Sequence, residues 1–395
     1  MPAYDVAVIG AGVFGSWTAR CLRRENRRVL LVDAWGPGHS RSSSGGESRI
    51  IRMGYGADAI YSRMAERSLK LWKELFAEVG QGALFHQTGV LWIGREDDPY
   101  TCATRETLRE AGVPIEILSA SELTRRYPQI VLSQETQLRN EGRTGDTVGI
   151  LEPESGALLA RRAVAAVVDD GMRYGVEYAR ESVSSPSGTG HLTSLRTASG
   201  EAIHAEQFVF ACGPWLPKLF PELLGSRIRP TRQEVLFFAP PAGDARFAPP
   251  QMPIWLDFTD PRGPYVFPDL EGRGVKLAFD RHGPAFDPDS GDRNVSRESV
   301  EQARQFLAER FPALRDAPLT ESRVCQYENT SNGDFLIDRH PDFENVWLVG
   351  GGSGHGFKHG PAVGDYVTGR IVDDAPEEPR FSLASKGETQ SRTVY

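Results

Sequence analysis

The chain has 395 residues, enough for two or three domains with a substantial buried core. Its 45 Lys and Arg against 53 Asp and Glu give a net charge of −8, which argues against a nucleic-acid-binding protein. Charged residues make up 25% of the chain, so extensive disorder is not expected. No apolar run reaches the ~18–20 residues of a membrane-spanning helix.

The two ends of the chain and its cysteines bear on localisation. The N-terminal residues lead straight into a strand and lack the basic and apolar regions of a signal peptide. The final residues Thr393–Tyr395 are not a peroxisomal address. Four cysteines are widely spaced with no Cys-x-x-Cys pair, so we expect no disulfide framework and no metal site. These features predict a cytoplasmic protein without membrane contact.

The N-terminal region has the pattern of a β-α-β unit. The apolar runs Val6–Ile9 and Val29–Val32 predict buried strands, and an amphipathic helix ending near Arg24 separates them. A Ser/Gly-rich loop follows at Ser40–Gly46, and a helix is predicted from about Tyr61 to Val79.

The pattern changes in the middle of the chain, where Thr88–Gly94 predicts a strand that leaves the first unit. The later predicted elements are helices at Thr104–Ala111, Ala120–Arg126 and Ala160–Tyr174, hairpins within Ser182–Ser199, strands at Gln207–Ala211 and Val346–Val349, a surface loop at Ala239–Pro250, and a helix from about His355 to Ile371. We infer an α/β protein in which a dinucleotide-binding domain is interrupted by insertions that form a second, mostly antiparallel domain.

A G-x-G-x-x-G fingerprint joins the first strand to the first helix. Gly10 permits the tight turn, Gly12 lets the backbone approach a pyrophosphate, and Gly15 lets helix and strand pack closely. Asp33 lies 23 residues after Gly10, at the end of the second strand, where it would accept from ribose hydroxyls, and Ala34 beside it is predicted to line the same site. The fingerprint predicts a dinucleotide cofactor without separating FAD from NAD.

A second glycine-rich turn follows the predicted strand near the C-terminus. Five glycines fall within the nine residues from Gly350 to Lys358, so the backbone is expected to approach something flat or bulky. A helix start there would stabilise negative charge on a reduced flavin, whereas a cation such as Lys358 opposes the helix dipole. A ligand carboxylate would explain that lysine, and a solvated lysine is the alternative. His355 is interpreted as a helix-start residue.

These pieces together resemble the monomeric sarcosine oxidase family, which includes N-methyltryptophan oxidase and pipecolate oxidase and belongs to the D-amino-acid-oxidase type of FAD enzyme. Four motifs in the family's order carry the resemblance: Ser48–Arg52, Val275–Leu277, Cys325–Tyr327 and Ser353–Lys358. The resemblance implies a Rossmann-type FAD-binding domain, predicted at 1–87, 150–216 and 318–383. It also implies an inserted α+β substrate domain on a mixed, largely antiparallel sheet, predicted at 88–149 and 217–317, with 384–395 as a C-terminal tail.

The same resemblance implies a reaction and its partners. Enzymes of this family oxidise the C–N bond of N-substituted amino acids, such as sarcosine, and the resulting imine is hydrolysed. The flavin is then reoxidised by O2, which yields hydrogen peroxide. The expected partners are therefore a small amino-acid substrate and O2, and a monomer is expected.

Site residues can be carried over from the family one at a time. Cys325 matches the cysteine bonded to the flavin 8α-methyl, and Lys276 matches the lysine that activates O2. Arg52 and Lys358 match the pair that holds the substrate carboxylate, and Arg49 matches a residue near the flavin. Residues predicted to line the substrate or cofactor site are Tyr265, Tyr327, Gly352, Gly354 and Gly356. Lys358 is predicted to contact the cofactor as well as the substrate.

Two geometrical points remain open in the sequence. Arg49 and Arg52 share a face if their segment is helical and point to opposite sides if it is extended. A lysine within a strand, such as Lys276, is otherwise expected at a solvated edge.

One departure from the family pattern affects the substrate. The family has a histidine four residues after the O2-activating lysine, and this chain has Asp280. A carboxylate there would favour a cationic amine or bind substrate hydroxyls, or it would pair with Lys276 or Arg281. Fructosyl-amino-acid (Amadori) oxidases carry acidic residues shortly after the equivalent lysine, so they are the alternative function. An NAD-dependent dehydrogenase and a non-catalytic flavoprotein are alternatives from other classes.

Overall fold

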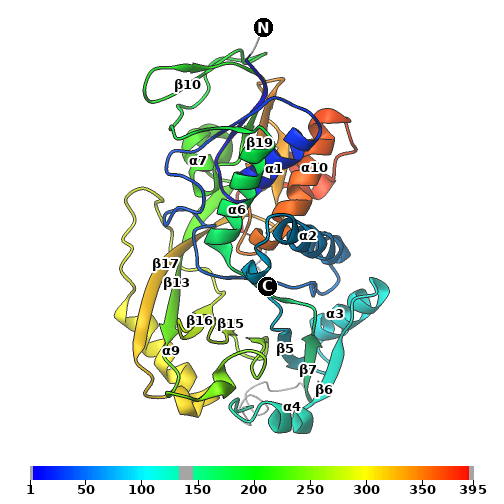
Figure 1. Ribbon diagram of the computed structural model, residues 1–395, viewed down its shortest axis with the longest axis vertical. Helices are drawn as coiled ribbons and strands as arrows, with labels where there is room; N and C mark the ends of the chain where they lie inside the picture. The colour runs from blue at the N-terminus through cyan, green and yellow to red at the C-terminus, as the bar shows by residue number, and fades with distance from the viewer. Residues whose placement is uncertain (1–2, 133–145, 391–395) are drawn as a thin grey trace.

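The computed structural model describes residues 3–132 and 146–390. The upper part of the molecule in Figure 1 is built on a six-stranded sheet. Its strands, in spatial order, are β18 (Leu336–Arg339), β19 (Val346–Gly350), β12 (Ala205–Phe210), β1 (Tyr4–Ile9), β2 (Val29–Val32) and β9 (Glu177–Ala179). All neighbours are parallel except β18 and β19. Parallel strands with apolar runs need cover on both faces, and this sheet carries helices.

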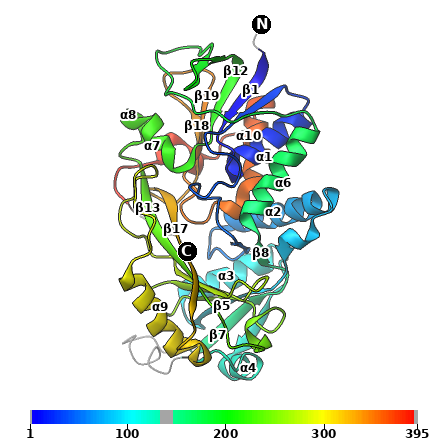
Figure 2. The ribbon, with the colours of Figure 1, turned by 60° about the vertical axis from the view of Figure 1, so that its left-hand side comes forward.

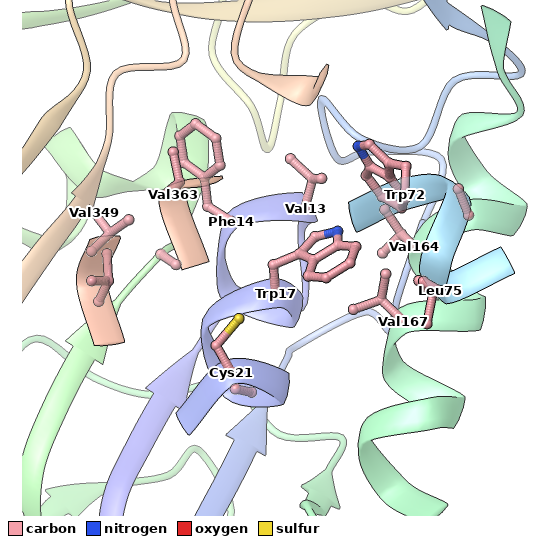
Figure 3. Packing of buried hydrophobic residues seen from close by; sticks show 14 of the residues in the cluster. Val13, Phe14, Trp17, Cys21, Trp72, Leu75, Val164, Val167, Val349 and Val363 are labelled. Carbon is pink, nitrogen blue, oxygen red and sulfur yellow. The ribbon is translucent and has the colours of Figure 1, made fainter. Parts of the chain in front are cut away.

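The helix α1 (Val13–Arg24) lies at the centre of that cover. It packs on α10 (Gly360–Val372) and α6 (Ala160–Arg173), with α2 (Ala59–Glu78) beyond them. Trp17 is fully buried and meets Trp72 edge-on, with ring centroids 5.0 Å apart. Figure 3 shows both side chains within the buried cluster around α1. A Cβ at Gly364 would lie 2.8 Å from the Trp17 carbonyl carbon, so glycine there permits the close approach of α1 and α10. The predicted β-α-β unit is confirmed.

The lower part of the molecule is built on an eight-stranded sheet. Its strands, in spatial order, are β17 (Leu319–Thr330), β13 (Ile228–Phe238), β16 (Val275–Phe279), β15 (Pro264–Phe267), β14 (Ile254–Asp257), β5 (Val90–Arg95), β7 (Thr147–Glu152) and β6 (Glu116–Ser119). Only the β14–β5 pair is parallel, which confirms the mixed, largely antiparallel sheet. The helices α3 (Pro99–Glu110), α4 (Ala120–Arg126) and α9 (Arg297–Arg310) lie around it.

Two long strands join the two parts. Figure 2 shows β13 and β17 side by side, running from the lower sheet toward the upper one, and their pairing register extends from Ile228↔Thr330 to Phe238↔Leu319. β17 begins at the predicted domain boundary near 318 and pairs within the eight-stranded sheet. The exact domain boundaries stay a prediction, and residues 1–2, 133–145 and 391–395 of the predicted segments lie outside the described residues.

Several smaller elements complete the fold: a three-stranded sheet of β3 (Arg49–Ile51), β8 (Gly156–Leu158) and β4 (Phe85–His86), a two-stranded sheet of β10 (Leu195–Arg196) and β11 (Ala202–Ile203), and the short helices α7 (Leu216–Leu219) and α8 (Pro221–Leu224). The C-terminal helix differs from its prediction, because a 3-10 turn at Phe357–His359 precedes α10, which begins at Gly360. Beyond Phe381, Ser382, Leu383 and Lys386 are buried. Within the described ranges, no helix is long and apolar enough to cross a membrane.

Candidate active site

A large cavity opens at the carboxyl ends of the parallel strands β1, β2, β12 and β19. The turns that follow these strands supply Gly10, Asp33, Cys212 and Gly352 to its wall. Ligands of open parallel sheets bind at this edge because the turns there leave backbone groups unpaired. The predicted residues that line the cavity are Gly10, Gly12, Asp33, Ala34, Arg49, Cys325, Tyr327, Gly352, Gly354 and Gly356.

The glycines of the fingerprint have different structural reasons. Gly10 has φ +105°, and a Cβ there would lie 2.4 Å from the Ala211 carbonyl oxygen. A Cβ at Gly15 would lie 1.9 Å from the Gly10 oxygen, so both positions require glycine for packing. At Gly12 the nearest atom is Ser44 Oγ at 3.6 Å, so the space over Gly12 is open to the cavity. Gly10 and Gly15 thus have the tight turn and the close packing expected of them, and the approach of a pyrophosphate to Gly12 stays a prediction.

Asp33 is held by backbone amides of the same region. Its Oδ1 accepts from the amides of Trp35 (2.8 Å) and Gly36 (2.7 Å), and its Oδ2 accepts from the Ala11 amide at 2.7 Å. A carboxylate oxygen accepts two hydrogen bonds, so Oδ2 retains one acceptor position for a ligand hydroxyl. The carboxylate is thus fixed in place while it keeps the capacity to bind a ribose.

The second glycine-rich turn packs against protein. A Cβ at Gly354 would lie 2.8 Å from the Tyr327 ring, and one at Gly356 would lie 2.8 Å from Gly352 Cα. The flat group that the backbone approaches at Gly354 is therefore a tyrosine ring. Glu328 also faces the cavity, accepts from the Gly352 amide at 3.2 Å, and has a pKa that burial raises to about 7. Sequence reasoning did not identify Glu328.

Arg49 links this cavity to a second group of side chains. Its Nη2 lies 3.2 Å from Cys325 Sγ, and its Nη1 donates to the Ser48 carbonyl at 2.9 Å. The segment that begins with Arg49 is the strand β3, so of the two alternatives the extended one holds. Arg49 accordingly faces Cys325, whereas Arg52 faces the Trp92 ring. Cys325 and Tyr327 alternate along β17 and share one face of it.

Lys276 is buried in the interior strand β16, which lies between β13 and β15. Its Nζ donates to the Ser48 carbonyl at 2.9 Å and to Ser48 Oγ at 3.2 Å, and it stands 4.0 Å from the centroid of the Phe267 ring. Burial and, secondarily, the positive charge of Arg49 lower the pKa of Lys276 well below its usual range. The alternative of a solvated edge position for Lys276 is wrong, because the strand order places β16 inside the sheet. Lys276 borders a small neighbouring cavity with Ser48 rather than the large one.

Asp280 and Tyr327 form a hydrogen-bonded pair beside this group. The Tyr327 hydroxyl donates to Asp280 Oδ1 at 2.8 Å, so Asp280 pairs with a tyrosine and not with Lys276 or Arg281. Burial raises the pKa of Asp280, while Tyr327, Arg52 and Lys358 act in the opposite direction. Burial and then Asp280 raise the pKa of Tyr327 well above its usual range. Tyr265 is near enough to Asp280 and Arg49 to feel both charges.

Arg52 and Lys358 meet around one tyrosine. The Arg52 guanidinium lies 4.2 Å from the centroid of the Trp92 ring and 4.6 Å from that of Tyr55. Lys358 Nζ donates to the Tyr55 hydroxyl at 2.7 Å and to the His355 carbonyl at 3.0 Å. Burial and the positive charge of Arg52 lower the pKa of Lys358 well below its usual range. Lys358 is buried, so the alternative of a solvated lysine is wrong.

A buried glutamate anchors the segment that carries Arg52. Glu152 is fully buried at the end of β7 and accepts from the amides of Met53 (2.8 Å) and Gly54 (3.0 Å). It also accepts from Trp92 Nε1 at 2.8 Å, so one carboxylate fixes both the backbone after Arg52 and the ring that stacks on it. The sequence offered one signal for this residue, an acidic side chain at the end of an apolar strand run.

A family model described as FAD dependent oxidoreductase matches residues 5–370. The chain is 32% identical to the monomeric sarcosine oxidase of Streptomyces avermitilis, over 96% of both chains. The structure resembles the crystal structure of L-proline dehydrogenase from P. horikoshii (TM-score 0.81, 20% identity, 97% and 98% coverage). It also resembles that of Aspergillus fumigatus Amadoriase II (TM-score 0.78, 21% identity, 96% and 89% coverage).

The chain therefore belongs to the family of FAD-dependent oxidoreductases. Within that family, the resemblance to monomeric sarcosine oxidases that the sequence motifs predicted is confirmed. The residues present also fit FAD: space is open over Gly12, Asp33 has an acceptor position to spare, and Cys325 lines the same cavity beside Arg49. An NAD-dependent dehydrogenase would need the dinucleotide fingerprint but not the group formed by Arg49, Lys276 and Cys325.

Proposed function

We propose that the protein is an FAD-dependent oxidase of N-substituted amino acids such as sarcosine or other N-methyl amino acids. The observation that carries the proposal is one arrangement of buried charge. Two cations, Arg52 and Lys358, stand within electrostatic reach of Asp280. An amino acid carries one carboxylate and one ammonium, and this site offers groups of the complementary charge to both.

The proposal assigns the cofactor to the large cavity. The amides at the start of α1 and the open space over Gly12 would hold the pyrophosphate, and Asp33 and Ala34 would hold the adenosine ribose. Gly352 and Gly356 would line the isoalloxazine side. When bound, FAD accepts the two electrons of amine oxidation and returns them to O2.

Cys325 is proposed as the point of covalent attachment to the flavin 8α-methyl. Formation of the C–S bond removes one hydrogen from the methyl group and one from the thiol, and O2 takes both electrons and both protons to become hydrogen peroxide. Arg49 Nη2 donates to the sulfur at 3.2 Å, and this contact holds Cys325 at the wall of the cofactor cavity.

Arg52 and Lys358 are proposed to bind the substrate carboxylate. An arginine offers a planar fork and a lysine a point charge, and both are buried where water competes little. Gly354, which has no side chain, lets the turn before Lys358 pack closely on the Tyr327 ring. Binding of an anion is strongest while Lys358 is protonated, so affinity falls as pH rises through its lowered pKa.

Asp280 is proposed to receive the substrate amine, with Tyr327 and Tyr265 lining the same side. Oxidation of the C–N bond requires the free electron pair on nitrogen, so the ammonium must first lose a proton. An ionised Asp280 attracts the ammonium and is placed to take that proton, while Tyr327 fixes the carboxylate by its hydrogen bond.

Lys276 is proposed to stabilise the negative charge that develops on O2 as it is reduced. The fixed ammonium is buried on Ser48 and Phe267, and a charge held in a dry site acts more strongly than one in water. Arg49 stands between Lys276 and Cys325, which connects this position to the cofactor cavity.

Peroxide release tests this proposal. Purified protein is supplied in air with sarcosine, N-methyltryptophan, pipecolate, proline and fructosyl-glycine, and peroxide is measured with each. Release with an N-methyl amino acid or pipecolate supports the proposal. Release with no member of the panel, from protein that carries flavin, would refute it.

A fructosyl-amino-acid oxidase is the second candidate. The observation that favours it is Asp280 in place of the family histidine, because a carboxylate also binds sugar hydroxyls. The Tyr327–Asp280 hydrogen bond leaves Oδ2 of that carboxylate to contact a ligand. Peroxide release with fructosyl-glycine that exceeds release with sarcosine would identify this activity.

We also propose that the enzyme is a monomer in the cytoplasm. Several bacterial sarcosine oxidase relatives are named as monomeric. The four cysteines are all unpaired thiols, as in a reducing compartment. Light scattering on the purified holoenzyme gives the mass of the particle, and a dimer would overturn the first part of this proposal.

A further inference from the structure

We propose that Tyr55 is the positioning residue for both carboxylate-binding cations: its hydroxyl holds Lys358, and its ring holds Arg52. This inference rests on the proposed function, because it assumes that these two cations bind a substrate carboxylate. Tyr55 lies three residues after Arg52 and is buried, with 4% of its surface exposed.

The Tyr55 hydroxyl is the centre of a buried cluster of nitrogen atoms. Lys358 Nζ lies 2.7 Å from its oxygen, His359 Nε2 2.8 Å, and His355 Nδ1 3.2 Å. All three residues come from the turn that leads into α10, whereas Tyr55 follows β3. The hydroxyl therefore ties two segments that lie about three hundred residues apart in the chain to one point.

The hydrogen positions in this cluster follow from counting donors and acceptors. His355 Nε2 lies 3.0 Å from the Gly333 carbonyl, which can only accept, so that nitrogen carries a hydrogen. In the neutral ring Nδ1 is then bare and accepts the hydrogen of Tyr55. The two lone pairs of the Tyr55 oxygen remain for the Lys358 ammonium and for His359 Nε2–H.

This count leaves one charge in the cluster. His359 Nδ1 is then bare, and it has no hydrogen-bond partner among the residues that the structure describes. A second proton on His355, at Nδ1, would leave three donors competing for two lone pairs on Tyr55, and a second proton on His359, at Nδ1, would be a buried N–H without an acceptor. The arrangement therefore places the single positive charge on Lys358, with one of its hydrogens directed at Tyr55 and another at the His355 carbonyl.

The ring of Tyr55 supports the second cation. The Arg52 guanidinium lies between this ring, at 4.6 Å, and the Trp92 ring, at 4.2 Å. An aromatic face attracts a guanidinium and restricts its tilt, so the fork is held in one plane. Removal of the hydroxyl alone should affect Lys358, and removal of the whole ring should affect both cations.

The inference predicts a change in pH dependence as well as in affinity. The charged or titratable groups that face Lys358 are Arg52, Tyr55, Asp280, Glu152 and His359, together with His355, whose carbonyl accepts its hydrogen bond. Tyr55 supplies an acceptor that stabilises the ammonium over the amine. Without it, Lys358 loses its proton at a lower pH, so affinity for an anion falls at a lower pH than in the wild type.

The test measures binding of methoxyacetate to the holoenzyme by calorimetry between pH 6 and pH 10. This ether has the skeleton and carboxylate of N-methylglycine but no amine, so any titration belongs to the protein. Tyr55→Phe should raise Kd about tenfold at pH 7 and move the alkaline loss of affinity to lower pH. Tyr55→Leu should raise Kd further because Arg52 also loses its ring.

Tyr61→Phe is the matched control. Tyr61 packs in the same cluster, with its ring 4.8 Å from that of His355, but its hydroxyl donates to Asp334 and not to the nitrogen cluster. This variant should keep the wild-type Kd and pH midpoint. A Tyr55→Phe enzyme with wild-type Kd and midpoint would overturn the inference.

Two further measurements separate the possible failures. If Arg52→Ala leaves methoxyacetate binding unchanged, the carboxylate site itself is misplaced, and the proposed function falls together with the inference. In the wild type, nitrogen NMR of labelled histidines should find His355 and His359 neutral with hydrogen on Nε2 at pH 7. An imidazolium at either position would overturn the inference without the need for a folded variant.

Discussion

The substitution Asp280→Asn tests the recognition of the substrate ammonium separately from the recognition of the substrate carboxylate. Asparagine keeps the size of the side chain and can still accept the Tyr327 hydrogen bond, which is 2.8 Å long in the wild type. The substitution removes one negative charge that stands within reach of Arg52 and Lys358. An amino-acid substrate loses the charge-assisted contact to its ammonium, which is about 1.5–3 kcal/mol, or roughly ten- to 150-fold in Kd.

A ligand with a carboxylate and no amine should respond in the opposite direction. Methoxyacetate is repelled by Asp280 in the wild type, so its binding should strengthen by about 1 kcal/mol, or roughly fivefold. The two Kd values come from anaerobic flavin reduction by the best N-methyl amino acid of the panel and from calorimetry with methoxyacetate. A change of both affinities in the same direction would refute the assignment of the amine to Asp280.

The same variant has a pH signature. Burial raises the pKa of Asp280, so its ionised form is present above that pKa and is lost as pH falls through it. Wild-type affinity for the amino acid should therefore decline on the acid side, and Asp280→Asn should lack this decline.

Three further outcomes follow from the proposed roles. In stopped-flow mixing, Lys276→Met should slow flavin reoxidation by O2 far more than anaerobic flavin reduction. An equal loss in both rates would contradict the role of Lys276. Lys386→Met, which removes an equally buried lysine elsewhere in the fold, is the control and should leave both rates unchanged. Cys325→Ala should release its flavin on acid precipitation while the wild type retains it, and flavin still attached in the variant would place the link elsewhere. Arg52→Ala should weaken substrate binding by about 2–4 kcal/mol, measured as Kd in anaerobic reduction, and an unchanged Kd would disprove its contact with the carboxylate.

Much of the fold could be predicted from local patterns. The apolar runs at β1 and β2, the glycines between them and Asp33 are close in sequence, so the β-α-β unit is visible without long-range information. The helix α9 was not predicted, although Ser296 caps it by accepting from the Ser299 amide and apolar residues recur at Val300, Ala303 and Leu307. That signal was present in the sequence and was overlooked.

The candidate site was predicted through motifs, and its supporting residues were not. Without a functional role, Lys276 was expected at a solvated edge of the sheet. The sequence does not show that its strand is an interior one, because the order β13–β16–β15 depends on pairings between segments far apart in the chain. Tyr55 has no local signature of its role, and the only local signal at Glu152 is its place at the end of an apolar strand run. Their partners lie far away in the chain, Lys358 at 303 residues from Tyr55, and Met53 and Gly54 at 99 and 98 residues from Glu152. Contacts of this kind depend on the folded packing and cannot be inferred from spacing along the chain.

Anaerobic absorbance spectroscopy tests the central claim most directly. The purified protein should be yellow, and its flavin bands should bleach when an N-methyl amino acid is added without oxygen. Admission of air should restore the bands and release hydrogen peroxide. A colourless protein that binds no FAD, or flavin bands that no amine of the panel bleaches, would contradict the account.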